Sequence, residues 1–462
     1  MTKRHGGMNE LTRRDALRLG AAGLGALAVP SFLAACGGGG GTSGGGNGGN
    51  ASGGGPSSGT VVFQGWDYMS QLVQQNIDHF QQLNPKIKVK YTPVISAQYV
   101  SKMDAEFSAG AQPDAMYVYD DSLAGWVDAG YLQPIDGLPG VDKVYNAIYK
   151  GNAQAMSYKG KRYGLPYYTD CMCLTYVDDI LQKAGISTPA KSLDEFTQQC
   201  LKIKQSGVVK YPIGIVMGVS DLWASWWWGL LFASNAKLFD DKLNPVMHKD
   251  KNTLQVLTWL HEALNKTKIL DPASLQRQST SNDLPFMAGT YAFTIGARYG
   301  LRALNNPAQA KIAGHAKMAW IPNLNGKLEG TVSNSRMYCL SKTTKVRDMA
   351  FKLMSYLGGF DKSGQPYTAK FWFEKEGLGF AFKQLAKDPQ IQAQLKQFAD
   401  PTVYEQLAEV ARPRRVIIEP WYSQFERKMQ QLVQQVLINQ MSPAAGLKAM
   451  ADEAGTLKKQ YS

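Results

Sequence analysis

The side chains in this sequence that could take part in ligand chemistry are tryptophans and aspartates gathered in a few short stretches. Four tryptophans fall within six residues: Trp223, Trp226, Trp227 and Trp228. Carboxylates stand beside aromatic rings or in pairs elsewhere: Trp66-Asp67, Asp120-Asp121 and Tyr168-x-Asp170. Indole rings cover the flat apolar faces of a ligand, whereas carboxylates accept hydrogen bonds from hydroxyl groups. This combination suits two kinds of chemistry, the binding of a carbohydrate and the hydrolysis of a glycosidic bond by paired carboxylates.

Alternating strands and helices are predicted to position the first of these side chains. Apolar residues 61–63 predict a strand that runs into Trp66, and further strands are expected at 87–91 and 113–118. Apolar residues at helical spacing predict helices in the two intervals between these strands, 69–83 and 97–108. This order predicts a parallel, helix-covered sheet with ligands at the carboxyl ends of its strands. Trp66 and the Asp120-Asp121 pair therefore fall where a ligand would bind.

The rest of the body continues the mixed pattern of an α/β protein. Further strands are expected at 165–176, 213–216, 291–295 and 336–341. Further helices are expected at 193–205, 224–233, 254–264, 350–357, 421–438 and 442–460. The body from Thr60 to Ser462 is longer than a single hydrophobic core usually grows, so we expect two lobes.

Residues 1–35 are predicted to be an export signal. The apolar stretch from Leu19 to Leu33 is too short to span a membrane but has the length of a signal-peptide core. It ends in Leu33-Ala34-Ala35-Cys36, which resembles the cleavage site of bacterial lipoproteins, where the cysteine carries the lipid. Arg13-Arg14 resembles a twin-arginine signal, with the general export route as the alternative. Residues 36–59 would then be the lipidated cysteine and a flexible Gly/Ser tether with a reach of about 25 Å.

Composition and motifs exclude several classes of protein. The net charge of +13 comes from scattered residues without a long basic run, which argues for a surface near anionic lipid or cell wall and against nucleic acid. His261-Glu262 lacks the second histidine of a zinc protease motif, and neither a nucleophile elbow nor a phosphate loop occurs. We therefore expect no cofactor and no metal.

Several short motifs, in order, resemble one family. Asn84-Pro85-x-Ile87, Gly110-x-x-Pro113-Asp114, Gly130-x-Leu132-x-Pro134-Ile135 and Gly160-Lys161-x-Tyr163-Gly164-x-Pro166 are followed by Leu340-Ser341-Lys342, Arg412-Pro413 and Ser442-Pro443-x-x-Gly446-Leu447. Their order and spacing resemble extracellular solute-binding proteins of ABC importers, in the sugar-binding group that includes maltose-binding protein. No single motif is specific, but together they cover nearly all of residues 60–462.

The resemblance implies a fold and a function. The fold would be the two-lobed periplasmic-binding-protein-like fold, with a helix-covered sheet in each lobe and crossing hinge strands between them. Residues 60–167 and 337–385 would form the first lobe, and residues 168–336 and 386–462 the second. The function would be that of a monomeric, lipid-anchored receptor, not an enzyme, which binds a sugar-like solute outside the cell and delivers it to the permease subunits of an ABC importer.

Sequence position and the resemblance together give twelve candidate ligand contacts. In the first lobe and the hinge they are Trp66, Asp67, Asp120, Asp121, Tyr168 and Asp170; in the second lobe they are Trp223, Trp226, Trp227, Arg298, Trp421 and Tyr422. The alternative for Trp66 is that it only fills the lobe surface, and at least one tryptophan of the cluster is expected in the core. Arg298 stands where many relatives carry a stacking tryptophan, which admits an acidic or otherwise polar ligand.

Two further expectations follow. A rival class is a secreted carbohydrate-active hydrolase with Asp67, Asp121 and Asp170 as its catalytic set, and a third is a cell-surface adhesion lipoprotein. If residues 165–176 and 336–341 cross side by side at a hinge, Cys339 lies close to Cys171 or Cys173, so we predict one disulfide there.

Overall fold

The computed structural model describes residues 58–219, 224–278 and 284–461. The predicted export signal, Cys36 and nearly all of the tether lie outside the described residues, as does Trp223. Within the described ranges, no helix has both the length and the apolar character needed to cross a membrane.

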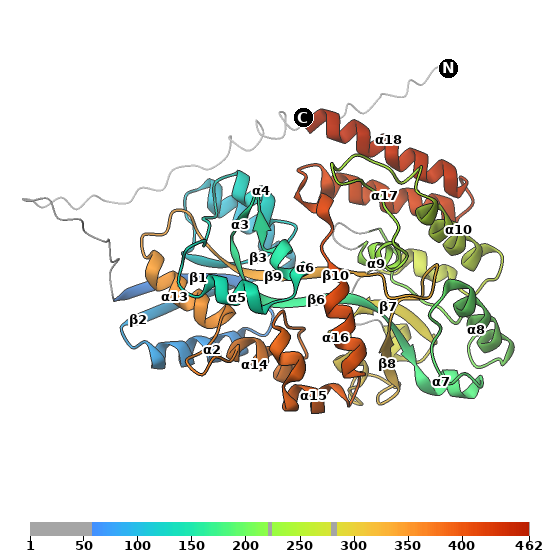
Figure 1. The fold of residues 1–462 in the computed structure, drawn as a ribbon, viewed down its shortest axis with the longest axis horizontal. Helices are drawn as coiled ribbons and strands as arrows, with labels where there is room; N and C mark the ends of the chain where they lie inside the picture. Colours follow the sequence, from blue (N-terminus) through green and yellow to red (C-terminus); the bar gives the residue numbers. More distant parts are fainter. Residues whose placement is uncertain (1–57, 220–223, 279–283, 462) are drawn as a thin grey trace, which may run out of the picture. The chain divides into compact units, whose positions relative to one another are not determined.

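A mixed sheet runs through the described part of the chain (Figure 1). Its main path is β2-β1-β3-β9-β6-β7, with β8 added beside β6 and β10 beside β9. The strands are β1 (Gly59–Trp66), β2 (Ile87–Val94), β3 (Ala115–Tyr119), β6 (Gly164–Val177), β7 (Phe293–Ala297), β8 (Ala316–Ala319), β9 (Thr331–Leu340) and β10 (Ala411–Arg412). A separate hairpin pairs β4 (Ser157–Tyr158) with β5 (Lys161–Arg162).

The first strands form the parallel arrangement that the sequence predicts. β1 pairs in parallel with β2 along its whole length and with β3 at Phe63 and Gln64. The connecting helices are α2 (Ser70–Leu83) and α3 (Tyr99–Ser108). Helix α2 buries Val73, Ile77 and Phe80, the positions whose helical spacing predicts it. Trp66 ends β1 and Tyr119 ends β3, so both lie at the carboxyl edge of this sheet.

Two hydrophobic cores lie at opposite ends of the long strands β6 and β9. The first core gathers around Phe63, Tyr117 and Tyr338, and the second around Trp227, Phe293 and Phe425. We call the residues around these cores the first lobe and the second lobe. β6 and β9 run antiparallel from Gly164 opposite Cys339 to Cys171 opposite Ser333 and pass from one core to the other, as Figure 1 shows. The predicted two-lobed α/β arrangement with crossing strands is therefore present.

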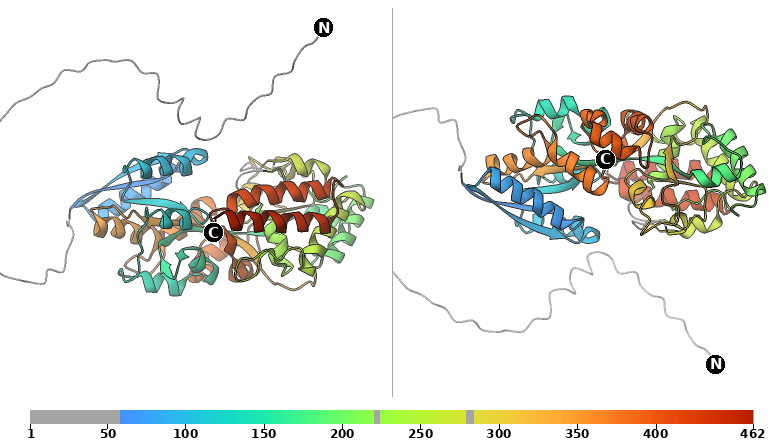
Figure 2. Two further views of the ribbon diagram at one scale, coloured as in Figure 1. Left: turned by 90° about the horizontal axis from the view of Figure 1, so that it is seen from above. Right: turned by 90° about the horizontal axis from the view of Figure 1, so that it is seen from below.

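The helices divide between the two cores. Those whose buried residues belong to the first core are α4 (Leu123–Asp128), α5 (Val141–Ala147), α13 (Arg347–Gly358), α14 (Tyr367–Glu376), α15 (Pro389–Leu395) and α16 (Pro401–Val410), besides α2 and α3. Those of the second core are α7 (Asp178–Lys183), α8 (Leu193–Gln205), α9 (Ser225–Ala233), α10 (Lys251–Asn265), α11 (Leu284–Met287), α17 (Tyr422–Leu437) and α18 (Pro443–Tyr461). Helices α17 and α18 lie side by side along the second lobe (Figure 2). Helix α6 (Lys150–Ala155) contacts β9 and β10, and α12 (Gly300–Leu304) follows β7.

The chain returns to the second core later than the predicted boundary at residue 386. Ile391 and Leu395 of α15 and Leu407 of α16 pack in the first core, and residues of the second core resume only at Val416. Pro389 and Pro401 start these two short helices, and Asp388 and Asp400 cap them. The apolar faces of these helices pack on the first lobe. The periodicity of a helix predicts which of its faces is buried but not which lobe that face packs against.

Residues 213–216 are not the strand that their β-branched composition predicts. Ile213 makes only isolated bridges, to Leu270 and to Phe293. Gly214 packs closely against Tyr291, since a side chain at that position would meet the ring at 2.4 Å. The segment therefore meets the sheet only at Phe293, the first residue of β7, where the Gly214 backbone N–H donates to the Phe293 carbonyl.

Candidate ligand-binding site

A cavity of about 460 Å³ lies between the two lobes, on one side of the crossing strands. We call it the interlobe cleft. The first lobe and the hinge contribute Trp66, Tyr68, Ser96, Tyr119, Tyr168, Arg336 and Leu378. The second lobe and the ends of β6, β7 and α12 contribute Met172, Thr175, Val216, Ser225, Trp226, Phe286, Met287, Thr294, Ile295, Gly296, Ala297, Tyr299, Gly300, Ala303 and Leu304. Both lobes therefore supply aromatic side chains to one space.

The first-lobe wall of the cleft is a stack of aromatic rings. Trp66 lies on Tyr119 with ring centroids 4.4 Å apart and planes 14° from parallel, and Tyr99 meets the indole edge-on at 5.4 Å. The guanidinium of Arg336 lies 4.6 Å from the centroid of the Tyr119 ring. These contacts hold the indole and the phenol in fixed orientations, so the wall is preorganised for a flat ligand.

Four tyrosines bring hydroxyl groups to the cleft: Tyr68, Tyr119, Tyr168 and Tyr299. Burial is the first cause that raises the pKa of each of them, and it raises the pKa of Tyr299 to about 12. The four phenols therefore stay protonated at neutral pH. A phenol can both donate and accept a hydrogen bond, but the Tyr68 hydroxyl already donates to Glu376 Oε2 at 3.3 Å.

Tyr299 owes its position to a buried ion pair. The backbone N–H of Tyr299 donates to Asp170 Oδ2 at 2.8 Å, and Arg298 Nε donates to Asp170 Oδ1 at 3.2 Å. The Arg298 guanidinium lies 4.0 Å from the Tyr404 ring centroid and donates to the Tyr404 carbonyl. Arg298 and Asp170 thus fix the loop after β7 against the hinge, and neither lines the cleft.

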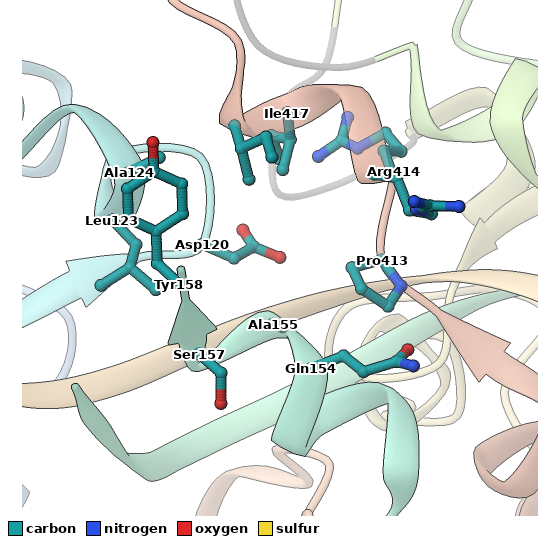
Figure 3. A pocket seen from close by; sticks show the side chains of 12 residues that line it. Asp120, Leu123, Ala124, Gln154, Ala155, Ser157, Tyr158, Pro413, Arg414 and Ile417 are labelled. Carbon is teal, nitrogen blue, oxygen red and sulfur yellow. The ribbon is translucent and has the colours of Figure 1, made fainter. Parts of the chain in front are cut away.

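A second buried ion pair lies at the end of β3. Arg336 Nη1 donates to Asp120 Oδ1 at 2.7 Å, and the Ser335 backbone N–H donates to Asp120 Oδ2 at 2.9 Å. Arg336 lines the interlobe cleft, whereas Asp120 lines a separate cavity of about 240 Å³ (Figure 3). The pair neutralises the charged side chain of Arg336 at the cleft.

The predicted ligand contacts divide into four groups. Trp66, Tyr168 and Trp226 line the interlobe cleft together. Asp120 lines the smaller cavity, and Trp223 lies outside the described residues. The remaining seven line neither cavity: Asp67, Asp121, Asp170, Trp227, Arg298, Trp421 and Tyr422.

Local partners account for most of the seven. Asp67 accepts hydrogen bonds from the Ser96 hydroxyl and backbone N–H, and the hydroxyl is the largest cause of its lowered pKa. Trp227 is 1% exposed and packs in the second core. Trp421 is also buried in that core, with its indole N–H donating to Glu419, and the Tyr422 hydroxyl donates to Glu426. Asp121 accepts from the Ser122 hydroxyl beside it.

Sequence reasoning missed Tyr119, Phe286, Tyr299 and Arg336, which line the cleft. A signal for Tyr299 was present, since it is one residue beyond Arg298 in the loop already identified. Tyr119 likewise precedes Asp120 at the predicted strand end. Successive side chains of a strand point to opposite faces of the sheet. The prediction of Asp120 in place of its neighbour Tyr119 therefore selected the face of the sheet away from the cleft.

The predicted disulfide is wrong. Cys171, Cys173, Cys200 and Cys339 are free, buried thiols. Cys339 lies opposite Gly164 and Cys171 lies opposite Ser333, so six residues of β9 separate the two positions. At about 3.3 Å per residue this is on the order of 20 Å, far beyond the reach of a disulfide. The strands do cross side by side, but in a different register.

Comparisons with known proteins agree with this architecture. Residues 66–359 match the family described as bacterial extracellular solute-binding protein. A protein of Brucella abortus named as a binding protein is 28% identical over 136 residues, which cover 29% of this chain and 33% of that protein. The match thus spans about one third of the length of the first curated relatives.

Solved structures match over most of the described chain. The sugar-binding protein MalE from Xanthomonas citri has a TM-score of 0.73 at 20% identity and covers 87% of this chain and 98% of its own. The maltose-bound MalE3 of T. maritima has a TM-score of 0.71 at 18% identity, with 86% and 99% covered. These likenesses confirm the predicted two-lobed periplasmic-binding-protein-like fold.

Proposed function

Because this chain belongs to the bacterial extracellular solute-binding proteins, the family that its motifs predict, we propose that it is the receptor of an ABC importer for a neutral carbohydrate. The ligand binds in the interlobe cleft and is delivered to the permease subunits. The observation that carries this proposal is the cleft itself, in which Trp66 and Tyr119 of the first lobe share one space with Trp226 and Phe286 of the second. A ligand that contacts both walls binds the closed arrangement of the lobes better than an open one and so favours closure.

The lining favours a neutral ligand. Among the described residues that line the cleft, Arg336 is the one charged side chain, and it is paired with Asp120. Arg298, which in the sequence admits an acidic ligand, is held by Asp170 and Tyr404 away from the cleft. The hydrogen bonds to ligand hydroxyls then come from the four tyrosines and from Thr175, Ser225 and Thr294.

The size of the cleft favours more than one sugar ring. Its volume of about 460 Å³ falls within the ~300–1,000 Å³ of pockets that hold drug-sized ligands. Aromatic side chains stand on both lobes, so rings can be covered on two sides. The maltose bound by the structural relative is a disaccharide, which suits this volume.

The positions of the aspartates favour a protein that binds a carbohydrate over one that hydrolyses it. Hydrolysis would need two carboxylates facing the ligand, about 5–9 Å apart. Asp67, Asp121 and Asp170, the set that the sequence offered for catalysis, do not line the cleft. We therefore propose a receptor and not a hydrolase.

Anchoring belongs to the same proposal and is supported by the sequence. We propose export by the twin-arginine route, lipid attachment at Cys36, and a monomeric body on the outer face of the cell membrane. A Cys36→Ser protein should lose incorporation of radiolabelled palmitate and leave the membrane fraction. Retention of both label and membrane association would contradict the anchor.

The test of the ligand is a thermal-shift screen followed by calorimetry. The screen covers mono- and oligosaccharides, polyols, sugar acids and glycerol phosphates, with each mixture analysed for reaction products. A neutral di- or trisaccharide should raise the melting temperature without turnover. Trp226→Ala should weaken its binding at least tenfold, about 1.4 kcal/mol. Trp259→Ala, a tryptophan of the same lobe that does not line the cleft, is the matched control. Equal affinity in the two variants, or preference for an acidic ligand, would overturn the proposal.

A further inference from the structure

The smaller cavity lies where two strands meet end to end along one edge of β9. We call it the hinge pocket; its lining comes from three segments, which begin at Asp120, Gln154 and Pro413. β3 runs antiparallel to β9 and reaches Tyr119 opposite Arg336, whereas β10 runs parallel to β9 and reaches Arg412 opposite Val332. The strands β3 and β10 run toward each other along this edge, and both must turn away from it. β3 does so at Asp120 and β10 at Pro413. The hinge pocket occupies the space that they leave.

The walls of the hinge pocket come from both lobes. Leu123 and Ala124 begin α4 of the first lobe, and Ile417 and Ile418 belong to the 3-10 turn η4 (Arg415–Ile418) that leads into the second. In Figure 3 the Asp120 carboxylate projects into the space between Leu123 and Pro413, with Ile417 above it. Apolar side chains of both lobes therefore lie around the Asp120 carboxylate.

The charged side chains that line the hinge pocket are paired, and two of them, Asp120 and Arg414, can still form a further hydrogen bond. Asp120 is paired with Arg336 and Arg414 with Glu426 at 3.1 Å, while the exposed Arg415 of the same lining is paired with Asp241, so each charged lining residue has a partner. One Asp120 oxygen accepts a hydrogen bond from Arg336 and the other accepts one from the Ser335 backbone N–H, and each can accept another. Arg414 is 4% exposed, and its buried Nε–H has no hydrogen-bond partner among the described residues. Buried donors are seldom left unpaired, because each costs free energy.

We propose that the hinge pocket is a second binding site, which takes one small, neutral, polyhydroxylated molecule the size of a single sugar ring or cyclic polyol. Its hydroxyls would donate to Asp120 and accept from Arg414, with Gln154 and Ser157 within the same lining. Its C–H face would lie against the isoleucines of η4 and the start of α4. The volume of about 240 Å³ is below that of pockets for drug-sized ligands, which limits the occupant to one ring.

This site shares no lining residue with the interlobe cleft, so a test that first fills the cleft can measure the hinge pocket by itself. Ala303 lines the cleft and not the hinge pocket, and Ala303→Trp fills the cleft with an indole. In this background, glucose, mannitol and myo-inositol serve as probes, with dissociation constants measured by calorimetry and by saturation-transfer NMR. We expect at least one probe to bind at a single site with millimolar affinity.

Two further variants locate that site. Ile418 lies on the rim of the hinge pocket at 41% exposure, so Ile418→Trp obstructs it with little effect on folding. Ile438, 49% exposed at the end of α17 and away from the pocket, gives the matched control Ile438→Trp. Probe affinity should fall at least tenfold in the first and stay unchanged in the second. Gln154→Leu, which keeps the size of the side chain but removes its amide, should weaken binding at least threefold.

Three results would overturn the site. They are the absence of binding by all three probes in the Ala303→Trp protein, equal affinity in Ile418→Trp and Ile438→Trp, and no effect of Gln154→Leu. None of them bears on the proposed receptor function, which is tested in the protein with an intact cleft. Conversely, if no carbohydrate binds in that screen, the proposed receptor function fails, but the result does not decide whether the hinge pocket binds a ligand.

Discussion

The buried pair of Asp120 and Arg336 gives the most direct test of how the hinge is held together. We consider Arg336→Met, Asp120→Asn and the double variant. Both side chains are at most 4% exposed, and Arg336 Nη1 lies 2.7 Å from Asp120 Oδ1. Methionine retains much of the length of the arginine stem, so the main change in Arg336→Met is loss of the guanidinium.

The expected magnitude follows from burial and distance. Two unit charges about 4 Å apart interact by about 4 kcal/mol at an effective dielectric constant of 20. Removing one member of a buried pair costs about 3–5 kcal/mol, because the remaining charge is left without compensation. Arg336→Met should therefore lower the free energy of unfolding by about 3–5 kcal/mol. In the double variant no buried carboxylate is stranded, so its loss should be smaller than the sum of the two single losses by more than about 1 kcal/mol.

Urea unfolding followed by tryptophan fluorescence measures these differences, and an exposed pair of the same residue types serves as the control. Arg415 and Asp241 also form an ion pair, but their side chains are 62% and 97% exposed. Arg415→Met should have no measurable effect on stability, since exposed pairs are screened by water and salt. Additive losses in the Asp120/Arg336 cycle, or equal losses from the buried and exposed pairs, would refute the reasoning.

Three further predictions concern the core, the thiols and the cleft. Trp227→Ala should lower the free energy of unfolding by about 3–5 kcal/mol in urea titrations, because the indole fills the second core; a loss below 1 kcal/mol would place it elsewhere. Burial raises the pKa of Cys171 to about 12 and that of Cys339 well above its usual value, so neither thiol should react with Ellman's reagent at pH 8 until the protein is denatured. Rapid labelling of the native protein, or a disulfide between peptides in mass spectrometry, would disprove this. Since the pKa of Tyr299 is raised to about 12, its phenol stays neutral well above pH 7, and affinity for a neutral sugar should change less than twofold between pH 6 and pH 10; a steep fall below pH 9 would show that another group titrates in the cleft.

The sequence predicts correctly those helices and strands whose local pattern of apolar and capping residues matches their packing in the fold. Residues 193–205 form α8 with the predicted bounds, and Ser192 caps it by accepting from the Glu195 backbone N–H. The parallel strands around Trp66 were predictable for a similar reason, since strand and helix patterns alternate there at short range. In both places the residues that define an element also determine its neighbours.

The tryptophan cluster was less informative, because three of its members share one almost wholly buried helix. Trp226, Trp227 and Trp228 are each at most 6% exposed, yet of these three only Trp226 lines the cleft. Helix α9 is apolar on every side, so its sequence has no polar face to mark the direction of solvent or ligand. Which indole meets a ligand depends on how β9 and β7 pack around the helix, and that information lies elsewhere in the chain.

The acids show why the chemistry of the cleft could not be read from strand ends alone. Asp120 and Asp170 stand where a ligand would be expected, but arginines 216 and 128 residues away neutralise them. A carboxylate buried at a strand end needs a partner, and a single sequence does not say whether a ligand or an arginine supplies it. Because arginines pair with these carboxylates, the groups in the cleft that can form hydrogen bonds with a ligand include tyrosines such as Tyr168 and Tyr299, which carry no charge at neutral pH. The ion pairs that keep Asp120 and Asp170 out of the cleft lining therefore support the proposed neutral ligand, and the same pairs fix the residues of the hinge.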